Sequence, residues 1–460
     1  MAAHPGGSLK ALLKAKRIRN DGKTFIPVGA IRSLCKRAAV LNELHDEGCA
    51  DYVCDPEKPA LKIFATLILH DRLDCISKFR DAGINDGDLP LGSTEQRTEL
   101  WSCRSPDKQP IASFRYPEDD DLIKWFYNTQ WSVHVPFLDL NGTHHRFERG
   151  TLMPWKFLDK YIDPGGFADV QKLEIHPDHY SGTQHSTFAL KTIRNTTDRI
   201  AFIQEIDALR KIRRGPHLVE LLATIEIDVE NRFMLIFPWA EGRSLKNMMG
   251  QDKRQICDPF NLTSQDLLQW VVTQCRGLIA ALETIHYAHL GSRDPGEKDY
   301  GVHFDIKPDN ILYFSQETDK SPFGTLKIAD CGLTTFYSRN SRSKKRNWAS
   351  FPGSLTYRSP EHDIRHVMSK KVDVWAMGCV FTELLTWAIL PHGSLHRYSR
   401  SSSRSSSRGP SRRPVKEFKL ARFREPTDTS SSSADDSPED NFFSKNFGTP
   451  KLKNSVSQSG

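Results

Sequence analysis

The order of secondary-structure signals between residues 157 and 390 constrains the fold more than any other feature. The stretches "KFLDKYIDPGGFADVQKLEI" and "STFALKTI" place β-branched and aromatic residues between turn formers, which is typical of short strands. Further on, "DRIAFIQEIDALRKIRR" and "DLLQWVVTQCRGLIAALETIHYAH" repeat apolar residues at helical spacing. Strands first and long helices afterwards predict two unequal lobes, a small β-rich lobe and a larger α-helical lobe.

The two ends of the chain differ from this middle part. Residues 1–150 alternate helical stretches such as "PALKIFATLILHDRLDCISKF" with loops rich in Asp, Gly and Pro. They predict a mostly helical N-terminal extension of unknown function. Residues 396–440 contain "RYSRSSSRSSSRGPSRRP" and "DTSSSSADDSPED". Such segments bury too little apolar surface to offset their ordering entropy, so we expect an Arg/Ser-rich disordered insert.

The charge balance and the cysteines of the chain indicate which partners and which cellular compartment to expect. The 460 residues include 64 Lys and Arg against 57 Asp and Glu, and the formal charge of +7 is no argument for nucleic acid as a partner. Nine cysteines without a CxxC pair suit a reducing compartment, so we expect an intracellular protein, cytoplasmic or nuclear. Cys49 and Cys54 lie near His45 and His70 in the sequence, but their irregular spacing favours buried or bystander thiols over a metal site.

Two segments bear on membranes and targeting. The start, "MAAHPGGSLKALLKAKRIRN", is basic, and its apolar run is too short for a secretory signal; a mitochondrial presequence is the alternative interpretation. The most apolar run, residues 374–390, is too short for a comfortable span and contains Glu383. A buried core helix is therefore predicted there, and no membrane partner is expected.

Four short motifs follow one another in the helical region. The stretch "HFDIKPDN", residues 303–310, could be an ordinary turn by composition. It is followed by "DCG" from Asp330, by "GSLTYRSPE" ending at Glu361, and by "DVWAMG" from Asp373. In this order and spacing the motifs resemble the catalytic core of eukaryotic protein kinases of the Ser/Thr type. This resemblance implies a two-lobed α+β kinase fold and disfavours the turn interpretation.

The resemblance assigns chemistry to the second lobe. Asp305 would accept or orient the proton of the acceptor hydroxyl, and Lys307 would neutralise the transferring phosphate. Asn310 and Asp330 offer the hard oxygen ligands that Mg²⁺ prefers, with the phosphates of ATP completing its coordination. ATP, Mg²⁺ and protein substrates of unknown identity are the implied cofactors and partners.

The resemblance also assigns residues of the first lobe. Lys191 follows "FAL" at the end of a predicted strand, and Glu205 lies fourteen residues later on the next helix; in the family this pair holds the α and β phosphates. The segment "IDPGGFADV" stands where the family has a glycine-rich loop, whose backbone amides approach phosphates closely. The implied nucleotide-binding residues are Gly165, Gly166, Phe167, Val170, Ala189 and Lys191.

Several positions depart from the family pattern. Phe304 replaces the arginine that usually receives a phosphorylated activation loop, so that switch loses its partner. Cys331 replaces a phenylalanine that helps to set the active state, and Asp163 and Ala168 replace the outer glycines of the loop. The connection between Ile285 and His303 is also longer than is usual in the family. None of these changes removes a predicted catalytic group.

The expected organisation is a helical extension, a kinase-like domain over residues 157–395, the Arg/Ser insert, and residues 441–460 as a remnant of a shortened helical lobe. The extension, the long connection and the Arg/Ser run resemble kinase-like proteins of filamentous fungi. A pseudokinase or truncated kinase that binds nucleotide or protein as a scaffold is the main alternative. An RNA-associated factor is a third, but the chain lacks an aromatic RNA-binding motif.

Overall fold

The computed structural model divides the chain into two units, which we present separately. The first, here the sheet unit, comprises Met1–Thr197 and Leu221–Pro238, and the second, the helical unit, comprises Asp198–Glu220 and Trp239–Gly460. The structure describes residues 8–20, 22–114, 120–158, 163–164, 168–193, 203, 206, 209, 212, 214–227, 232–287, 300–315, 323–331, 334–337, 355–360, 369–391, 443–444 and 451–452.

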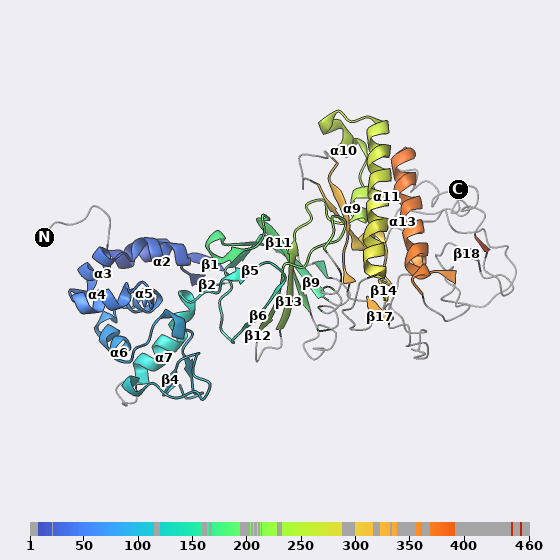
Figure 1. Ribbon diagram of the computed structural model, residues 1–460. Coiled ribbons are helices and arrows are strands. Elements are labelled where there is room, and N and C mark those ends of the chain that lie inside the picture. Colours follow the sequence, from blue (N-terminus) through green and yellow to red (C-terminus); the bar gives the residue numbers. More distant parts are fainter. Residues whose placement is uncertain are drawn as a thin grey trace, which may run out of the picture. The chain divides into compact units, whose positions relative to one another are not determined.

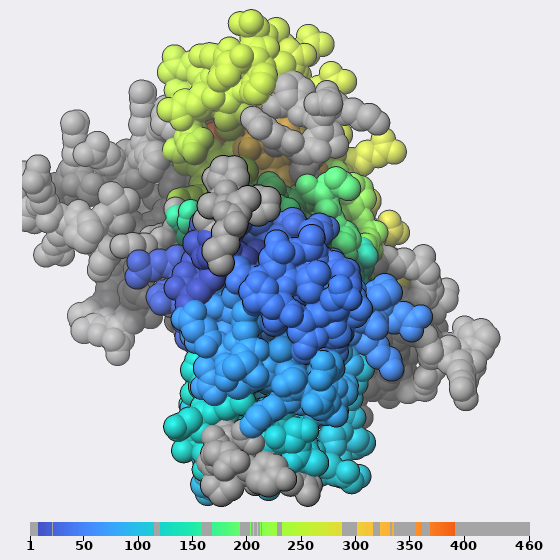
Figure 2. Space-filling view, turned by 90° about the vertical axis from the view of Figure 1, so that its left-hand side faces the viewer, coloured from blue at the N-terminus to red at the C-terminus, as the bar shows by residue number. Residues whose placement is uncertain are grey.

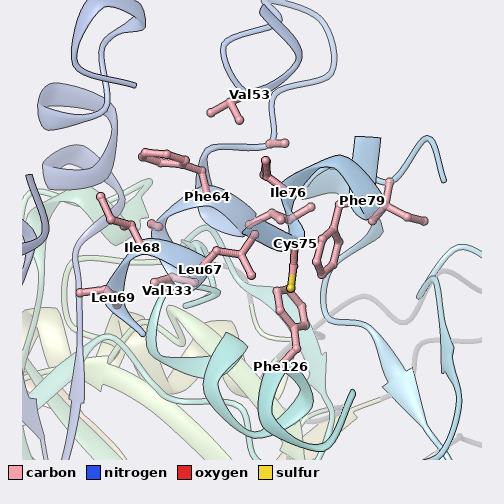
Figure 3. Packing of buried hydrophobic residues seen from close by; sticks show 14 of the residues in the cluster. Val53, Phe64, Leu67, Ile68, Leu69, Cys75, Ile76, Phe79, Phe126 and Val133 are labelled. Carbon is pink, nitrogen blue, oxygen red and sulfur yellow. The ribbon is translucent and has the colours of Figure 1, made fainter. Parts of the chain in front are cut away.

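The sheet unit begins with short helices that surround one buried helix (Figure 1). Its helices are α1 Leu9–Ala15, α2 Val28–Leu34, α3 Arg37–Leu44, α4 Glu47–Val53, α5 Leu61–Leu69, α6 Ile76–Asp81 and α7 Asp120–Thr129, with 3-10 turns at Leu73–Cys75, Asp86–Asp88, Ala112–Phe114, Gln130–Ser132 and Pro177–His179. Residues 63–69 of α5 are all buried. Phe64 of α5, Phe79 of α6 and Phe126 of α7 lie in one apolar core (Figure 3).

The largest sheet of this unit has seven strands. Its path is β6 Thr143–Phe147, β12 Ala223–Ile227, β13 Arg232–Pro238, β11 Thr187–Ile193, β9 Ala168–Ile175 and β7 Trp155–Phe157, with β8 Asp163–Pro164 also paired to β9. The strands expected around residues 168–193 are therefore present. Alternate residues such as Phe188 and Leu190 enter a core on one face, which leaves Lys191 on the other face.

The edge strand β6 pairs in parallel with β12, from Thr143 opposite Ala223 to Phe147 opposite Ile227. Residues that precede position 150 therefore complete the sheet. Short paired strands occupy the connections: β1 Ile18–Asn20 with β2 Lys23–Phe25, β3 Gly92–Ser93 with β4 Leu100–Trp101, and β5 Leu138–Asp139 with β10 Tyr180–Ser181.

Two long helices, α11 and α13, lie side by side in the helical unit (Figure 1). Its elements are α9 Leu245–Met249, α10 Arg254–Cys257, α11 Ser264–His286, α13 Lys371–Ile389, β14 Tyr300–Val302, β15 Ile311–Phe314, β16 Thr325–Ile328, β17 Thr335–Tyr337, β18 Phe443–Ser444 and β19 Lys451–Leu452, with 3-10 turns at Asp258–Phe260, Pro308–Asn310 and Leu355–Tyr357. A capping box of Thr263 and Asp266 starts α11.

Helix α13 is the apolar segment for which we predicted a core helix. By length and composition alone it is the one helix of the described residues that could cross a membrane. Its residues Met377, Val380 and Leu384 nevertheless pack with α11 in the core of the helical unit. At its end, Lys253 donates hydrogen bonds to the carbonyl oxygens of Ala388, at 2.6 Å, and Leu390, at 3.2 Å. These bonds satisfy carbonyl groups that the helix end leaves unpaired.

Candidate active site

The stretch from His303 to Asn310 connects β14 to β15 and ends in a 3-10 turn, Pro308–Asn310. Proline suits the first position of such a turn because its φ angle is already set, and it keeps the preceding Lys307 extended. Phe304 has a φ of 67°, a left-handed conformation that is uncommon for a bulky residue. Strain of this kind persists only where the surrounding contacts hold the backbone.

The carboxylate of Asp373 on α13 supplies those contacts. Its two oxygens accept hydrogen bonds from the backbone N–H groups of His303 and Phe304, both at 2.8 Å. One of these oxygens also lies 2.9 Å from Nε2 of His286 on α11. Asp373 is only 1% exposed, so these donors compensate the loss of water around its charge. The sequence located Asp373 in a motif but gave no sign of this role.

His303 connects the same loop to the neighbouring hairpin. Its Nδ1 accepts the N–H of Asp305 at 3.3 Å, and its Nε2 lies 3.1 Å from the carbonyl oxygen of Ala329. A carbonyl oxygen can only accept a hydrogen bond, so Nε2 is the donor of the second contact. The ring therefore joins the loop that carries Asp305 to the strand that leads to Asp330.

The side chain of Asp305 is held by one oxygen and open at the other. Oδ2 accepts hydrogen bonds from Nζ of Lys307 and Nδ2 of Asn310, both at 2.7 Å. Oδ1 is buried and has no hydrogen-bond partner within the described parts of the chain. A buried carboxylate oxygen without a donor is costly, so this atom is poised to accept a hydrogen bond from an incoming group.

Asn310 and Asp330 are brought together by the β15–β16 hairpin. Ile311 pairs with Ile328, and the N–H of Ala329 donates to the carbonyl oxygen of Asn310 at 2.9 Å. Asp330 follows directly, exposed and with a left-handed φ of 57°. The amide nitrogen of Asn310 is engaged with Asp305, which leaves its Oδ1 as a ligand. One amide oxygen and one carboxylate at the end of a hairpin are a donor set that fits Mg²⁺.

The predicted nucleotide-binding residues of the sheet unit share one face of the sheet. Lys191 on β11 is opposite Val170 on β9, so their side chains project from the same face. Ala189, two residues before Lys191, also projects there. This face is opposite to the one whose Phe188 and Leu190 enter the sheet core. Gly165, Gly166, Phe167 and Glu205 lie outside the described residues.

A second contact joins the segment before Glu361 to α13. The hydroxyl of Tyr357 donates to Glu383, with distances of 3.1 and 3.2 Å to its two carboxylate oxygens. Burial and the neighbouring Glu383 raise the pKa of Tyr357, so the phenol keeps its proton. Glu383, which argued against a membrane span, therefore has a polar partner inside the core. Glu361 itself lies outside the described residues.

Phe304 and Cys331 are two positions, both described by the structure, that depart from the family pattern. Phe304 uses its backbone N–H, rather than its side chain, to bind Asp373. Cys331, which directly follows Asp330, is buried at 5% exposure, so its thiol is enclosed by neighbouring groups.

Within the ranges that the structure describes, no group of three or more His, Cys, Asp and Glu side chains could hold a metal ion.

Comparison with known proteins agrees with this geometry. The family model of the protein kinase domain matches residues 165–421, more than half of the 460 residues. The chain belongs to the protein kinase family. Proteins of this family use ATP and a divalent metal ion in general. The predicted family and its mixed α+β fold are thereby confirmed, and the match continues beyond residue 395 into the Arg/Ser run.

Individual relatives cover part of the chain. The calcium/calmodulin-dependent protein kinase cmkA of Emericella nidulans is 25% identical over 249 residues, 54% of this chain and 50% of that kinase. The probable cyclin-dependent kinase 8 of Dictyostelium discoideum is 29% identical over 206 residues, 43% of this chain and 47% of that kinase. The tyrosine-protein kinase transforming protein ros of UR2 avian sarcoma virus is 28% identical over 244 residues, 52% of this chain and 55% of that kinase. This kinase chain spans about half the length of each of these three relatives.

Proposed function

We propose that this protein transfers the γ-phosphate of ATP to serine and threonine hydroxyls of protein substrates. The observation that carries the proposal is the state of Asp305. One of its carboxylate oxygens is held by Lys307 and Asn310, and the other is buried without a partner in the described ranges. An acceptor oxygen oriented in this way is what a hydroxyl needs when it loses its proton.

The residues divide the chemistry among themselves. Asp305 accepts the hydroxyl proton at Oδ1 while the hydroxyl oxygen bonds to the γ-phosphorus and the bond from that phosphorus to the bridging oxygen breaks. The ammonium group of Lys307 has three N–H donors, and one of them binds Asp305. The other two can donate hydrogen bonds to the transferred phosphate. Asn310 and Asp330 would hold Mg²⁺ through their side-chain oxygens. When bound, Mg²⁺ neutralises the phosphate charge that develops.

The sheet unit holds the nucleotide in this proposal. Lys191 neutralises the α and β phosphates, with Glu205 orienting its ammonium group. Val170 and Ala189, which share the face of Lys191, contact the adenine. Gly165 and Gly166 bring backbone amides close to phosphate oxygens, and Phe167 covers them. These roles are the ones that family membership implies for the matching positions.

Phosphate transfer to a generic basic protein tests the proposal. The Asp305→Asn variant keeps the shape of the side chain but removes the proton acceptor, so the rate should fall by about 10²–10⁴-fold. Asp309→Asn is the matched control, because Asp309 lies in the same loop and forms an exposed ion pair with Lys246 at 2.9 Å. It should retain activity within about threefold. Equal activity of the wild type and the Asp305→Asn variant would refute the proposed role.

The acceptor residue is a separate question, because relatives named as tyrosine kinases also match. A lysine at position 307 is typical of Ser/Thr-directed kinases, and it favours serine and threonine. Phosphoamino-acid analysis of the labelled product should recover phosphoserine and phosphothreonine. Recovery of phosphotyrosine alone would overturn this part of the proposal and leave the phosphate transfer itself intact.

A protein-binding scaffold is the second candidate function. It is favoured by apolar side chains on α13 that remain exposed, namely Val374, Leu385 and Ile389. Surfaces of this kind mark interaction sites when they are contiguous. A scaffold would show the same lack of phosphate transfer in the wild type and in Asp305→Asn, which distinguishes it from an active kinase.

A further inference from the structure

Lys62 is a partly buried lysine at the second residue of α5, in the helical region of the sheet unit. Figure 2 shows one face of this region, dark blue to cyan. The residues that follow Lys62 on the helix, 63–69, are all buried. Helix α5 also packs against the 3-10 turn Gln130–Ser132, and the nearby His134 brings its Nδ1 to 3.4 Å from Nζ of Lys62. Two basic side chains therefore meet at the border of an apolar core.

Lys62 forms no ion pair with any residue that the structure describes. Asp86 is close enough to influence it, but both oxygens of this carboxylate accept backbone N–H groups, from Lys62 at 2.9 Å and from Ile63 at 3.2 Å. Arg32 lies on α2, which packs on α5, and adds a second positive charge. Burial lowers the pKa of Lys62, Asp86 opposes this shift and Arg32 adds to it. The neutral form of the amine is therefore more populated than in an exposed lysine.

The imidazole of His134 is the polar partner of the Lys62 side chain. An ammonium group can only donate hydrogen bonds, so Nδ1 accepts this contact. Burial, and then Lys62, lower the pKa of His134 to about 3, so the ring is neutral near pH 7. A neutral acceptor orients the amine without the negative charge that would hold its proton. Lysines in surroundings of this kind are the ones that act as nucleophiles.

We propose that Lys62 is a covalent binding site for an aldehyde that carries an anionic group. The lone pair of the neutral amine forms a bond to the carbonyl carbon, and the carbonyl oxygen leaves as water with the two amine protons. A C=N double bond, an imine, then joins the ligand to Nζ of Lys62. The attachment is reversible, because water can add back and release both the amine and the aldehyde.

The surroundings of Lys62 select this class of ligand. Imine formation has water as its only leaving group, so it requires no oxidant and no further reactant beyond the amine and the aldehyde. Arg32 is exposed and forms no ion pair within the described ranges, so its guanidinium group is available to an anion such as a carboxylate or a phosphate. An anionic aldehyde therefore meets a nucleophile and a cation that belong to two packed helices, α5 and α2.

Labelling of the full chain with pyridoxal 5′-phosphate, followed by borohydride reduction and peptide mapping, tests the proposal. Mapping separates Lys62 from every other lysine, Lys191 included. Lys58 is the internal control, because it is exposed and lies in the same segment. At neutral pH, Lys62 should be labelled at least about fivefold faster than Lys58, since each unit by which a pKa falls gives about ten times more neutral amine. In urea above the unfolding transition the two rates should become equal. Equal rates in the folded chain would overturn the proposal.

Substitutions separate the amine from the cation beside it. Lys62→Arg keeps the positive charge but cannot form an imine, so the adduct at this position should be lost while labelling of Lys58 stays the same. Arg32→Gln should slow labelling of Lys62 by pyridoxal 5′-phosphate at least about threefold. It should change labelling by pyridoxal, which lacks the phosphate, by less than about twofold. Lys36→Gln removes a charge just after α2 and, as the matched control, should affect neither reagent. Equal loss with both reagents in Arg32→Gln would contradict the selection of an anionic aldehyde.

Discussion

Two aspartates in different regions of this protein use the same hydrogen-bonding device. In the N-terminal helical region, Asp86 accepts the backbone N–H groups of Lys62, at 2.9 Å, and Ile63, at 3.2 Å, at the start of α5. In the helical unit, Asp373 accepts those of His303 and Phe304. The first pair starts a core helix, and the second holds the backbone next to Asp305. The same kind of hydrogen bond therefore stabilises a core helix in one region and positions the proposed catalytic Asp305 in the other.

Removal of each carboxylate should separate these two roles, and the largest effect is expected at Asp373. Asp373→Ala leaves two backbone donors and His286 buried without their acceptor, which should cost about 3–5 kcal/mol of unfolding free energy. Because the loop that carries Asp305 is released, phosphate transfer per folded molecule should fall at least about 100-fold. Urea denaturation and a transfer assay below the unfolding transition measure the two effects.

Asp86→Ala is the matched comparison. It should lower the unfolding free energy by about 1–2 kcal/mol, the usual cost of losing a helix-start acceptor. Phosphate transfer per folded molecule should stay within about twofold, because no predicted site residue contacts Asp86. An activity loss as large as that of Asp373→Ala would break the distinction between the two regions.

The pH dependence of the N-terminal region gives a smaller effect. Burial raises the pKa of Asp86 from 3.8 to about 6, so the part of its contribution that depends on its proton is lost as pH rises through that range, while the hydrogen bonds from Lys62 and Ile63 remain. Burial, and then Lys62, lower the pKa of His134 from 6.5 to about 3, so its contribution is lost as pH falls. Between pH 4 and 6 the two trends oppose each other, and the stability of wild-type α5 should change little.

Single variants should expose each trend. In Asp86→Asn, only His134 remains, and α5 should lose up to about 2.5 kcal/mol between pH 6 and pH 4. In His134→Gln, only Asp86 remains, and α5 should gain a similar amount over the same range. Hydrogen exchange of the amides of residues 61–69, corrected for intrinsic rates, measures both. If the stability of α5 changes in the same direction in both variants between pH 6 and pH 4, Asp86 and His134 do not have the opposite effects that we predict.

The smallest effect is expected from dephosphorylation. Phe304 replaces an arginine, and its N–H is held by Asp373 rather than through a phosphorylated residue. We therefore expect the loop that carries Asp305 to keep its geometry without a phosphate. Phosphatase treatment should change the transfer rate by less than about twofold. A large loss would mean that basic residues elsewhere, such as Lys344 and Lys345, bind an activating phosphate.

The predicted site residues of this region are neighbours in the sequence, whereas the contacts that hold them are not. Asp305, Lys307 and Asn310 lie within one eight-residue stretch, and the structure joins them by direct hydrogen bonds. The hydrogen bonds from His303 and Phe304 to Asp373 join residues that are about seventy positions apart in the sequence. Local sequence patterns cannot show that Asp373 binds the backbone of His303 and Phe304. Nothing in the residues around Asp373 indicates which distant segment its carboxylate contacts.

The same contrast holds for the fold: some strands can be predicted from local sequence, and others form only through tertiary contacts. The strands around Val170 and Lys191 were predicted from β-branched residues and turn formers, and both are present. Strand β6, "THHRF", was not predicted, because its polar residues give no strand pattern. Pairing with the buried strand β12 makes it a strand. Tertiary contacts override propensity at such an edge.

The thermal shift caused by Mg·ATP tests the central claim most directly, because nucleotide and metal must bind before transfer. Millimolar Mg·ATP should raise the melting temperature of the wild type, and saturation at about 100 times Kd would add about 2.7 kcal/mol. Asp305→Asn should keep this shift, while Asp330→Ala should lose its Mg²⁺-dependent part. A wild type without any shift would contradict the assignment of this site to phosphate transfer.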